Sequence, residues 1–108
     1  MLYILTVGES IPIIIMTPPP VDADVLQRHW TEQGKETRQT RNNATARKYG
    51  QAASEVAKKL NVHLLDLWEK LGGEDGAEVY GKLLSDGLHL SGEGNLRVFH
   101  CFKDYVAE

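Results

Sequence analysis

Disulfide bonds and membrane-spanning helices are the first features that this sequence lacks. Cys101 is alone, so no internal disulfide is possible, and we expect a reducing, cytoplasmic compartment with Cys101 buried as a small apolar side chain. The longest apolar stretch, residues 13–16, is far shorter than the roughly 20 residues of a membrane-spanning helix. Residues 1–16 lack the basic start of a secretory signal, and Glu9 and Pro12 interrupt them. We therefore expect neither a membrane span nor a cleaved signal.

Metal-binding and phosphate-binding motifs are also missing. No group of His, Cys, Asp and Glu has metal-ligand spacing, and no glycine-rich phosphate loop occurs, so we expect no metal and no cofactor. A net charge of −3 argues against general binding to nucleic acid or to an anionic membrane. Residues 35–48 have a local excess of positive charge, but no aromatic residue interrupts them. We interpret this segment as a solvated helix face rather than a nucleic-acid interface.

The composition that is present fits one soluble globular domain. The 108 residues are 42% hydrophobic and 25% charged, which is ordinary for such a protein. A chain of this length buries roughly 65% of its unfolded surface, which is enough for one modest core.

Three segments predict a parallel β-α-β unit. Residues 11–16 are apolar with little alternation, which is typical of a strand buried on both faces. Residues 40–60 repeat apolar side chains at helical spacing, and residues 62–67 predict a second strand. A right-handed crossover would make the two strands parallel neighbours. The apolar residues of the helix are Tyr49, Ala53, Val56, Ala57 and Leu60.

The flanking segments give weaker signals. Residues 2–7 are compatible with a strand or with the end of a helix. A parallel connection to residues 11–16 would need a dozen or more residues, so a strand here would either pair antiparallel with residues 11–16 or have no native partner in this chain. The prolines at 18–20 stiffen the exit from the first strand, and Asp22 can cap a helix that runs to Trp30. One face of a final helix is marked by Leu96, Phe99, Phe102 and Val106.

The strongest chemical signal is Asp86-Gly-Leu-His89. A turn of this kind can aim both side chains the same way, so that the carboxylate accepts a hydrogen bond from one imidazole nitrogen and leaves the other nitrogen basic. That is the base-and-orienter part of a hydrolytic triad. Ser91 is a plausible N-cap for the helix that follows. A histidine that merely caps a turn beside a carboxylate would have the same spacing.

This stretch, followed by Leu-Ser and then Gly-Asn, resembles the C-terminal signature of SGNH (GDSL-type) esterases. Residues 13–22, with their Thr-Pro-Pro-Pro turn, and the helix and strand over residues 41–68 resemble the branch that includes isoamyl acetate-hydrolysing esterases. The resemblance covers about residues 11–99. It implies a catalytic Asp86 and His89, and an α/β fold equivalent to the C-terminal half of a three-layer, flavodoxin-like SGNH domain with a short, mostly parallel sheet. Residues 1–108 would then form one partial domain.

The serine of that family lies in an N-terminal Gly-Asp-Ser motif, and its oxyanion groups are a glycine and an asparagine in two later blocks. All of them come well before the Thr-Pro-Pro-Pro turn, whereas only sixteen residues precede Thr17 here. Gly8-Glu9-Ser10 offers a substitute serine. However, Ser10 runs directly into a strand with Pro12, so we interpret it as a turn residue and expect the nucleophile to be missing.

Two functions remain open from the sequence. The first is a carboxylester hydrolase of small esters by ancestry, inactive as this chain alone. The second is a catalytically inactive isoform or pseudoenzyme that binds a protein partner, or a second copy of itself, through an uncovered sheet edge.

Overall fold

The structure is a computed structural model that describes residues 6–7, 11–35 and 40–107. It is elongated, with extents of 49 × 25 × 24 Å. The described elements, in chain order, are β1 (Thr6–Val7), β2 (Ile11–Pro12), β3 (Ile14–Met16), α1 (Ala23–Glu32), α2 (Asn43–Leu60), β4 (His63–Leu65), α3 (Leu67–Lys70), α4 (Ala77–Tyr80), the 3-10 turn η1 (Gly81–Leu83) and α5 (Gly92–Ala107).

The predicted β-α-β unit is confirmed. β3 and β4 pair in parallel, with Ile14 opposite His63 and Met16 opposite Leu65, and α2 connects them. The side chain of Asn42 accepts a hydrogen bond from Thr45 N and so caps the start of α2. Asn61 ends the helix in the left-handed conformation that asparagine tolerates. These two local signals set the helix length and bring the chain back beside β3.

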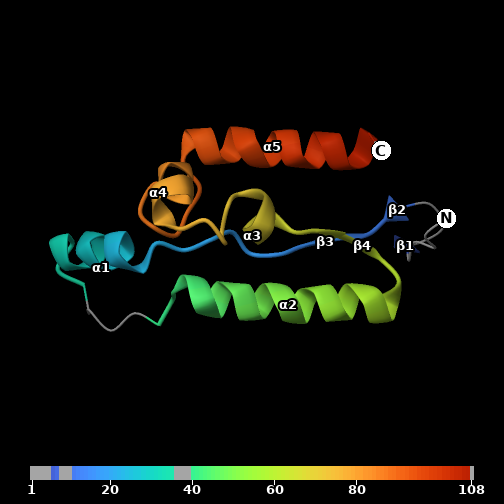
Figure 1. Cartoon of the computed structure of the whole chain (residues 1–108), viewed down its shortest axis with the longest axis horizontal. Coiled ribbons are helices and arrows are strands. Elements are labelled where there is room, and N and C mark those ends of the chain that lie inside the picture. Colours follow the sequence, from blue (N-terminus) through green and yellow to red (C-terminus); the bar gives the residue numbers. More distant parts are fainter. Residues whose placement is uncertain (1–5, 8–10, 36–39, 108) are drawn as a thin grey trace.

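The sheet lies between two helical layers (Figure 1). α2 covers one face, and α5 runs along the other face together with α3. The main core lies on the α5 side, where Leu65, Leu67, Leu71 and Leu83 are buried and Val98, Cys101 and Tyr105 of α5 pack against them. The arrangement is the three-layer α/β/α order expected for part of an SGNH domain.

Both strands are shorter than the sequence predicts, and the first is less buried. Residues 13–15 are only half-buried, and Ile11 and Met16 are exposed. The prediction of a strand buried on both faces is therefore wrong for the ends of residues 11–16. The predicted strand is in fact split: Ile11 belongs to β2 in a separate two-stranded sheet, and β3 has a partner strand on one edge only among the described residues.

The predicted antiparallel alternative for the first segment is confirmed for the described pairs. Thr6 pairs with Pro12 and Val7 with Ile11, in a small sheet separate from β3 and β4. Asp22 caps α1 by accepting a hydrogen bond from Val25 N, as predicted, and α1 continues two residues beyond Trp30. None of the helices in the described ranges is long and apolar enough to cross a membrane.

Two helical faces differ from expectation. Tyr49, Val56 and Leu60 of α2 are exposed, and the residues that α2 buries are Ala46, Gly50 and Ala57. In the same way, the predicted stripe of α5 (Leu96, Phe99, Phe102 and Val106) is exposed. Each helix therefore has a packed face and a neighbouring apolar face that no described residue covers.

Candidate active site

Asp86 and His89 lie on a short loop whose two ends are tied together. Leu84 and Leu90 form an isolated antiparallel bridge at its base. Ser85 N donates to the carbonyl oxygen of His89 (2.8 Å), and Ser91 N donates to that of Leu83 (2.8 Å). The loop is therefore held by its own backbone, in the way that functional loops are commonly mounted on a rigid scaffold.

The structure brings the two side chains into contact. Asp86 Oδ2 lies 2.8 Å from His89 Nδ1, and Asp86 Oδ1 accepts hydrogen bonds from the backbone N–H groups of Leu88 (2.9 Å) and His89 (2.8 Å). The carboxylate is largely covered, with its side chain 18% exposed, whereas the His89 side chain is 74% exposed. The loop thus hides the carboxylate and presents the imidazole.

The protonation of this pair follows from its hydrogen bonds. Burial alone would raise the pKa of Asp86, but the hydrogen bonds from His89 and Leu88 and the nearby imidazole lower it to about 2. Asp86 is therefore ionised at neutral pH and can only accept a hydrogen bond, so His89 Nδ1 must donate. In the neutral imidazole the lone pair is then on Nε2, which is the atom that a general base uses.

The loop is anchored to the start of α1. Asp22 N donates to the carbonyl oxygen of Gly87 (2.9 Å). Gly87 has φ +89°, and a Cβ there would lie 2.5 Å from Asp22 O and 2.6 Å from Leu26 N. Only glycine allows both this conformation and this approach. The glycine between Asp86 and His89 therefore fixes where the pair sits.

The other end of the loop is anchored to α5. Ser91 Oγ accepts a hydrogen bond from Gly94 N (3.0 Å), which is the predicted N-cap, and donates to Lys82 O (2.8 Å). Gly94 is buried, and a Cβ there would overlap the carbonyl oxygen of Leu83. The helix start can approach the loop this closely only because position 94 has no side chain.

A polar network below the loop was not singled out from the sequence. Asn43 Oδ1 accepts from Val21 N (3.1 Å) and from Trp68 Nε1 (2.9 Å), and Asn43 Nδ2 donates to Gly73 O (3.0 Å). Tyr80 Oη donates to Val21 O (2.7 Å). Val21 is thus held from both sides, and it precedes the residue that anchors Gly87. No motif marks this network, because its members are far apart in sequence.

A second polar contact joins the carboxyl ends of the two parallel strands. Thr17 is buried; its Oγ1 donates to Asp66 Oδ1 (2.9 Å) and accepts from Trp68 N (3.1 Å). Asp66 Oδ1 also accepts from Glu69 N (3.1 Å) and so caps the start of α3. These residues stiffen the sheet edge at which open α/β sheets hold their sites.

An open, mostly apolar cavity of about 640 Å³ lies beside the loop and after β3. Its lining includes Pro18, Val21, Ala46, Tyr49 and Leu88. The Asp86–His89 loop contributes Leu88 to this lining, and neither Asp86 nor His89 is part of it. A small apolar group could be held there.

The other residues of chemical interest do not belong to this loop. Ser10 lies outside the described residues. His63 has a structural contact, with its Nδ1 2.9 Å from Tyr105 Oη. Cys101 is half-buried against the core rather than fully buried. Within the described ranges, no group of three or more His, Cys, Asp or Glu side chains could hold a metal ion.

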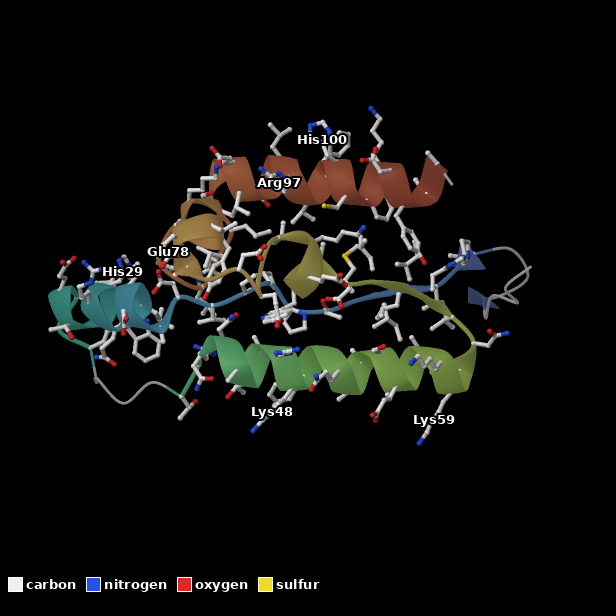
Figure 2. All side chains as sticks on the ribbon, viewed as in Figure 1. His29, Lys48, Lys59, Glu78, Arg97 and His100 are labelled. Carbon is white, nitrogen blue, oxygen red and sulfur yellow. The ribbon has the colours of Figure 1, made fainter. Side chains whose placement is uncertain are left out.

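Of the basic residues in the segment 35–48, Arg47 and Lys48 lie on α2, Lys35 and Arg41 lie outside the helices, and Arg38 lies outside the described residues, so the predicted helix face is seen only at the end of the segment. Figure 2 shows Lys48 and Lys59 pointing away from the sheet, on the outer side of α2. Arg47 lies over the Trp68 ring, 5.2 Å from its centroid, and forms an ion pair with Glu74 (3.4 Å). His100 points outward from α5.

Comparison with known proteins gives one family. Residues 6–102 match the family described as GDSL-like Lipase/Acylhydrolase. The isoamyl acetate-hydrolyzing esterase 1 homolog of Bos taurus is 37% identical over 87 residues, which is 81% of this chain and 33% of that protein. A GDSL esterase/lipase of Arabidopsis thaliana is 34% identical over 87 residues, which is 81% of this chain and 35% of that protein. GDSL esterase/lipase WDL1 of Oryza sativa subsp. japonica is 27% identical over 93 residues, which is 86% of this chain and 34% of that protein. The chain spans about a third of the length of these curated relatives.

Proposed function

Because the chain belongs to the GDSL-like lipase/acylhydrolase family, we propose that Asp86 and His89 are the orienting acid and the general base of a carboxylester hydrolase. The observation that carries this proposal is the 2.8 Å contact between Asp86 Oδ2 and His89 Nδ1, made by a covered carboxylate and an exposed imidazole. Small esters are the proposed substrates, and the names of the relatives and the modest apolar cavity beside Leu88 support this class.

The proposed mechanism uses the free nitrogen of His89. A serine attacks the ester carbonyl carbon while His89 Nε2 takes the hydroxyl proton, and the same nitrogen later protonates the leaving alkoxide. A water molecule then attacks the acyl-serine by the same route and releases the carboxylic acid. Asp86 stays ionised throughout, because it accepts three hydrogen bonds, and it stabilises the imidazolium that forms. The serine and the oxyanion donors would come from family motifs that this sequence does not contain. Ser10, which we interpret as a turn residue, lies outside the described residues.

We therefore expect the 108-residue chain to have little esterase activity by itself. A serine-directed phosphonate should label it to well below one equivalent, and a Ser10→Ala variant should behave in the same way. Mass spectrometry of the labelled protein measures this. Stoichiometric labelling of Ser10 that is abolished in Ser10→Ala would contradict the expectation and would make Ser10 the nucleophile.

The role of His89 needs a complete domain. The bovine relative can be rebuilt with this chain in place of the stretch that it matches, and the chimera assayed on a short-chain ester. His89→Ala should lower kcat/KM by about 10²–10⁴-fold, which is the usual contribution of a general base. His100→Ala, which alters an exposed imidazole outside the loop, is the matched control. Equal activity of His89→Ala and His100→Ala would refute a catalytic role for His89.

A further inference from the structure

Side chains from two layers of the molecule meet on the backbone of Val21. The N–H of Val21 donates to Asn43 Oδ1 (3.1 Å), and its carbonyl oxygen accepts from Tyr80 Oη (2.7 Å). Asn43 is the first residue of α2, which covers one face of the sheet, whereas Tyr80 is buried in the core on the α5 side (Figure 1). We call these three residues, Asn43, Val21 and Tyr80, the Val21 clamp.

The Tyr80 hydroxyl is suited to this contact. Burial raises the pKa of Tyr80, and the negative charge of Asp22 raises it further. The phenol therefore keeps its proton at neutral pH and donates it to Val21 O. Because this donor is buried, leaving it without its acceptor would cost free energy, so the contact resists displacement of Val21.

The clamp reaches the Asp86–His89 loop through the backbone. Asp22 directly follows Val21, and its N–H donates to Gly87 O (2.9 Å). A Cβ at Gly87 would lie 2.5 Å from Asp22 O, so the two backbones are in close contact. A displacement of Val21 would therefore be passed to Gly87, two residues before the histidine.

The clamp also reaches the loop through an apolar contact. The side chain of Leu88 packs against a small buried cluster that is formed by Val21, Ala46 and Trp68. Asn43 Oδ1 accepts from Trp68 Nε1 (2.9 Å) as well as from Val21 N, so one oxygen ties two members of the cluster together. Leu88 directly precedes His89, and its packing partners are thus held by Asn43.

The amide of Asn43 has a single orientation that satisfies its surroundings. Two N–H donors, from Val21 and Trp68, point at Oδ1, and the carbonyl oxygen of Gly73 accepts from Nδ2 (3.0 Å). A Cβ at Gly73 would overlap the Trp68 ring, so the indole is also packed closely on this side. The asparagine is therefore a fixed anchor.

We propose that Asn43 and Tyr80 are positioning residues for His89: by holding Val21, they fix where the loop presents its imidazole relative to the sheet. Asp86 sets the orientation of the ring within the loop, through its 2.8 Å contact, and the Val21 clamp sets the position of the loop as a whole. The inference rests on the proposed function, because it concerns the placement of the general base. A misplacement of a reacting group by about 1 Å can cost roughly 10²-fold in rate.

The first test is hydrogen exchange of single amides in the 108-residue chain, measured by NMR. Tyr80→Phe removes only the hydroxyl group that donates to the clamp. It should speed exchange of Asp22 N–H, which is bonded to Gly87 O, at least about 10-fold more than exchange of Thr17 N–H, which is bonded to Leu65 O in the sheet. The comparison separates a local release of the loop from a general loss of stability.

Tyr105→Phe is the matched control, because it also removes one hydroxyl group, which contacts His63 Nδ1 (2.9 Å) away from the loop. It should leave the ratio of the Asp22 and Thr17 exchange rates unchanged. If Tyr80→Phe accelerates the two amides equally, or changes the ratio no more than Tyr105→Phe does, the inference is overturned.

A conservative substitution at the anchor gives a rescue test. Asn43→Asp keeps an oxygen that accepts from Val21 N and Trp68 Nε1, whereas Asn43→Ala removes it. Exchange of Asp22 N–H should therefore be slower in Asn43→Asp than in Asn43→Ala. Equal exchange in these two variants would overturn the role of Asn43, and if Asn43→Ala does not fold, the Tyr80→Phe ratio decides.

The second test measures turnover in the bovine chimera described above. Tyr80→Phe should lower kcat by about 10-fold or more and change KM by less than about 2-fold, because the base is displaced while the substrate still binds. Tyr105→Phe should change neither. Faster Asp22 exchange with an unchanged kcat would overturn the inference. A chimera in which His89→Ala keeps full activity, or which hydrolyses no ester, contradicts the proposed function, and the exchange ratio then decides by itself whether the clamp places His89.

Discussion

The Asp86–His89 loop differs from a second region, the outer edge of β3 together with the exposed apolar side chains of α2 and α5, which we call the β3 flank. In the loop, the carboxylate, the backbone ends and the helix start all have hydrogen-bond partners within the chain. On the β3 flank, a strand edge and large apolar side chains face outward. The difference teaches that a catalytic-looking geometry can be formed by residues close in sequence, whereas a strand edge and the apolar side chains beside it have no such local partners among the described residues.

The largest loss of stability should come from a side chain that fills the space between the loop and α5. Gly94→Ala places a methyl group against the carbonyl oxygen of Leu83, and we expect it to lower the free energy of unfolding by about 3 kcal/mol. Gly92→Ala is the control on the same helix, because nothing lies within 4 Å of its Cβ position, and it should be neutral or slightly stabilising. Urea unfolding of both variants measures the difference, and equal stabilities would contradict the close approach.

The polar network that supports the loop should give the next largest effect. Asn43→Ala leaves Val21 N, Trp68 Nε1 and Gly73 O without their partner, so we expect a loss of about 2–3 kcal/mol. Asn95→Ala removes one exposed hydrogen bond to Ser91 O and should cost less than about 0.5 kcal/mol. If urea unfolding gives the same small loss for both, the Asn43 network does not support the loop.

Low pH should lower the free energy of unfolding, because it protonates Asp86. Its pKa is lowered from 3.8 to about 2 in the folded protein, so the folded state favours the carboxylate. The stability that comes from this preference is complete above about pH 4 and is lost as the pH falls toward 2. Asp86→Asn should therefore flatten the acid limb of a stability–pH curve. An unchanged acid limb would show that Asp86 makes no such contribution.

The smallest effect should come from the β3 flank of the isolated chain. Val56→Ser removes an apolar side chain that is already 46% exposed, so the stability should change by less than about 0.5 kcal/mol. Leu26→Ala, at a fully buried position of α1, should instead cost about 2–5 kcal/mol in the same assay. A comparable loss at Val56 would mean that α2 already buries this face.

The sequence predicts the features that depend on near neighbours. The caps at Asp22 and Ser91, the β-α-β order and the Asp86–His89 contact all follow from the pattern and spacing of residues. It does not predict which apolar face of α2 or α5 packs, because helical period alone cannot distinguish a face that meets the sheet from the face beside it.

The sequence does not predict the long-range polar contacts either. Asn43 meets Val21 and Trp68 only after β3 and β4 have paired, and an asparagine at a helix start is otherwise read as a capping residue. Thr17 donates to Asp66 and accepts from Trp68 N, and these contacts cannot be predicted from the sequence for the same reason. Pairs of this kind need knowledge of the fold before they can be recognised.

The central claim is that Asp86 holds His89 with its proton on Nδ1 and its lone pair on Nε2. Nitrogen NMR of the neutral imidazole measures the tautomer directly, with His89→Gln used to assign the signal among the four histidines. We predict the Nδ1–H tautomer for His89 and a shift toward a tautomer mixture in Asp86→Asn. An Nε2–H tautomer in the unmodified chain, or no response to Asp86→Asn, would contradict the claim.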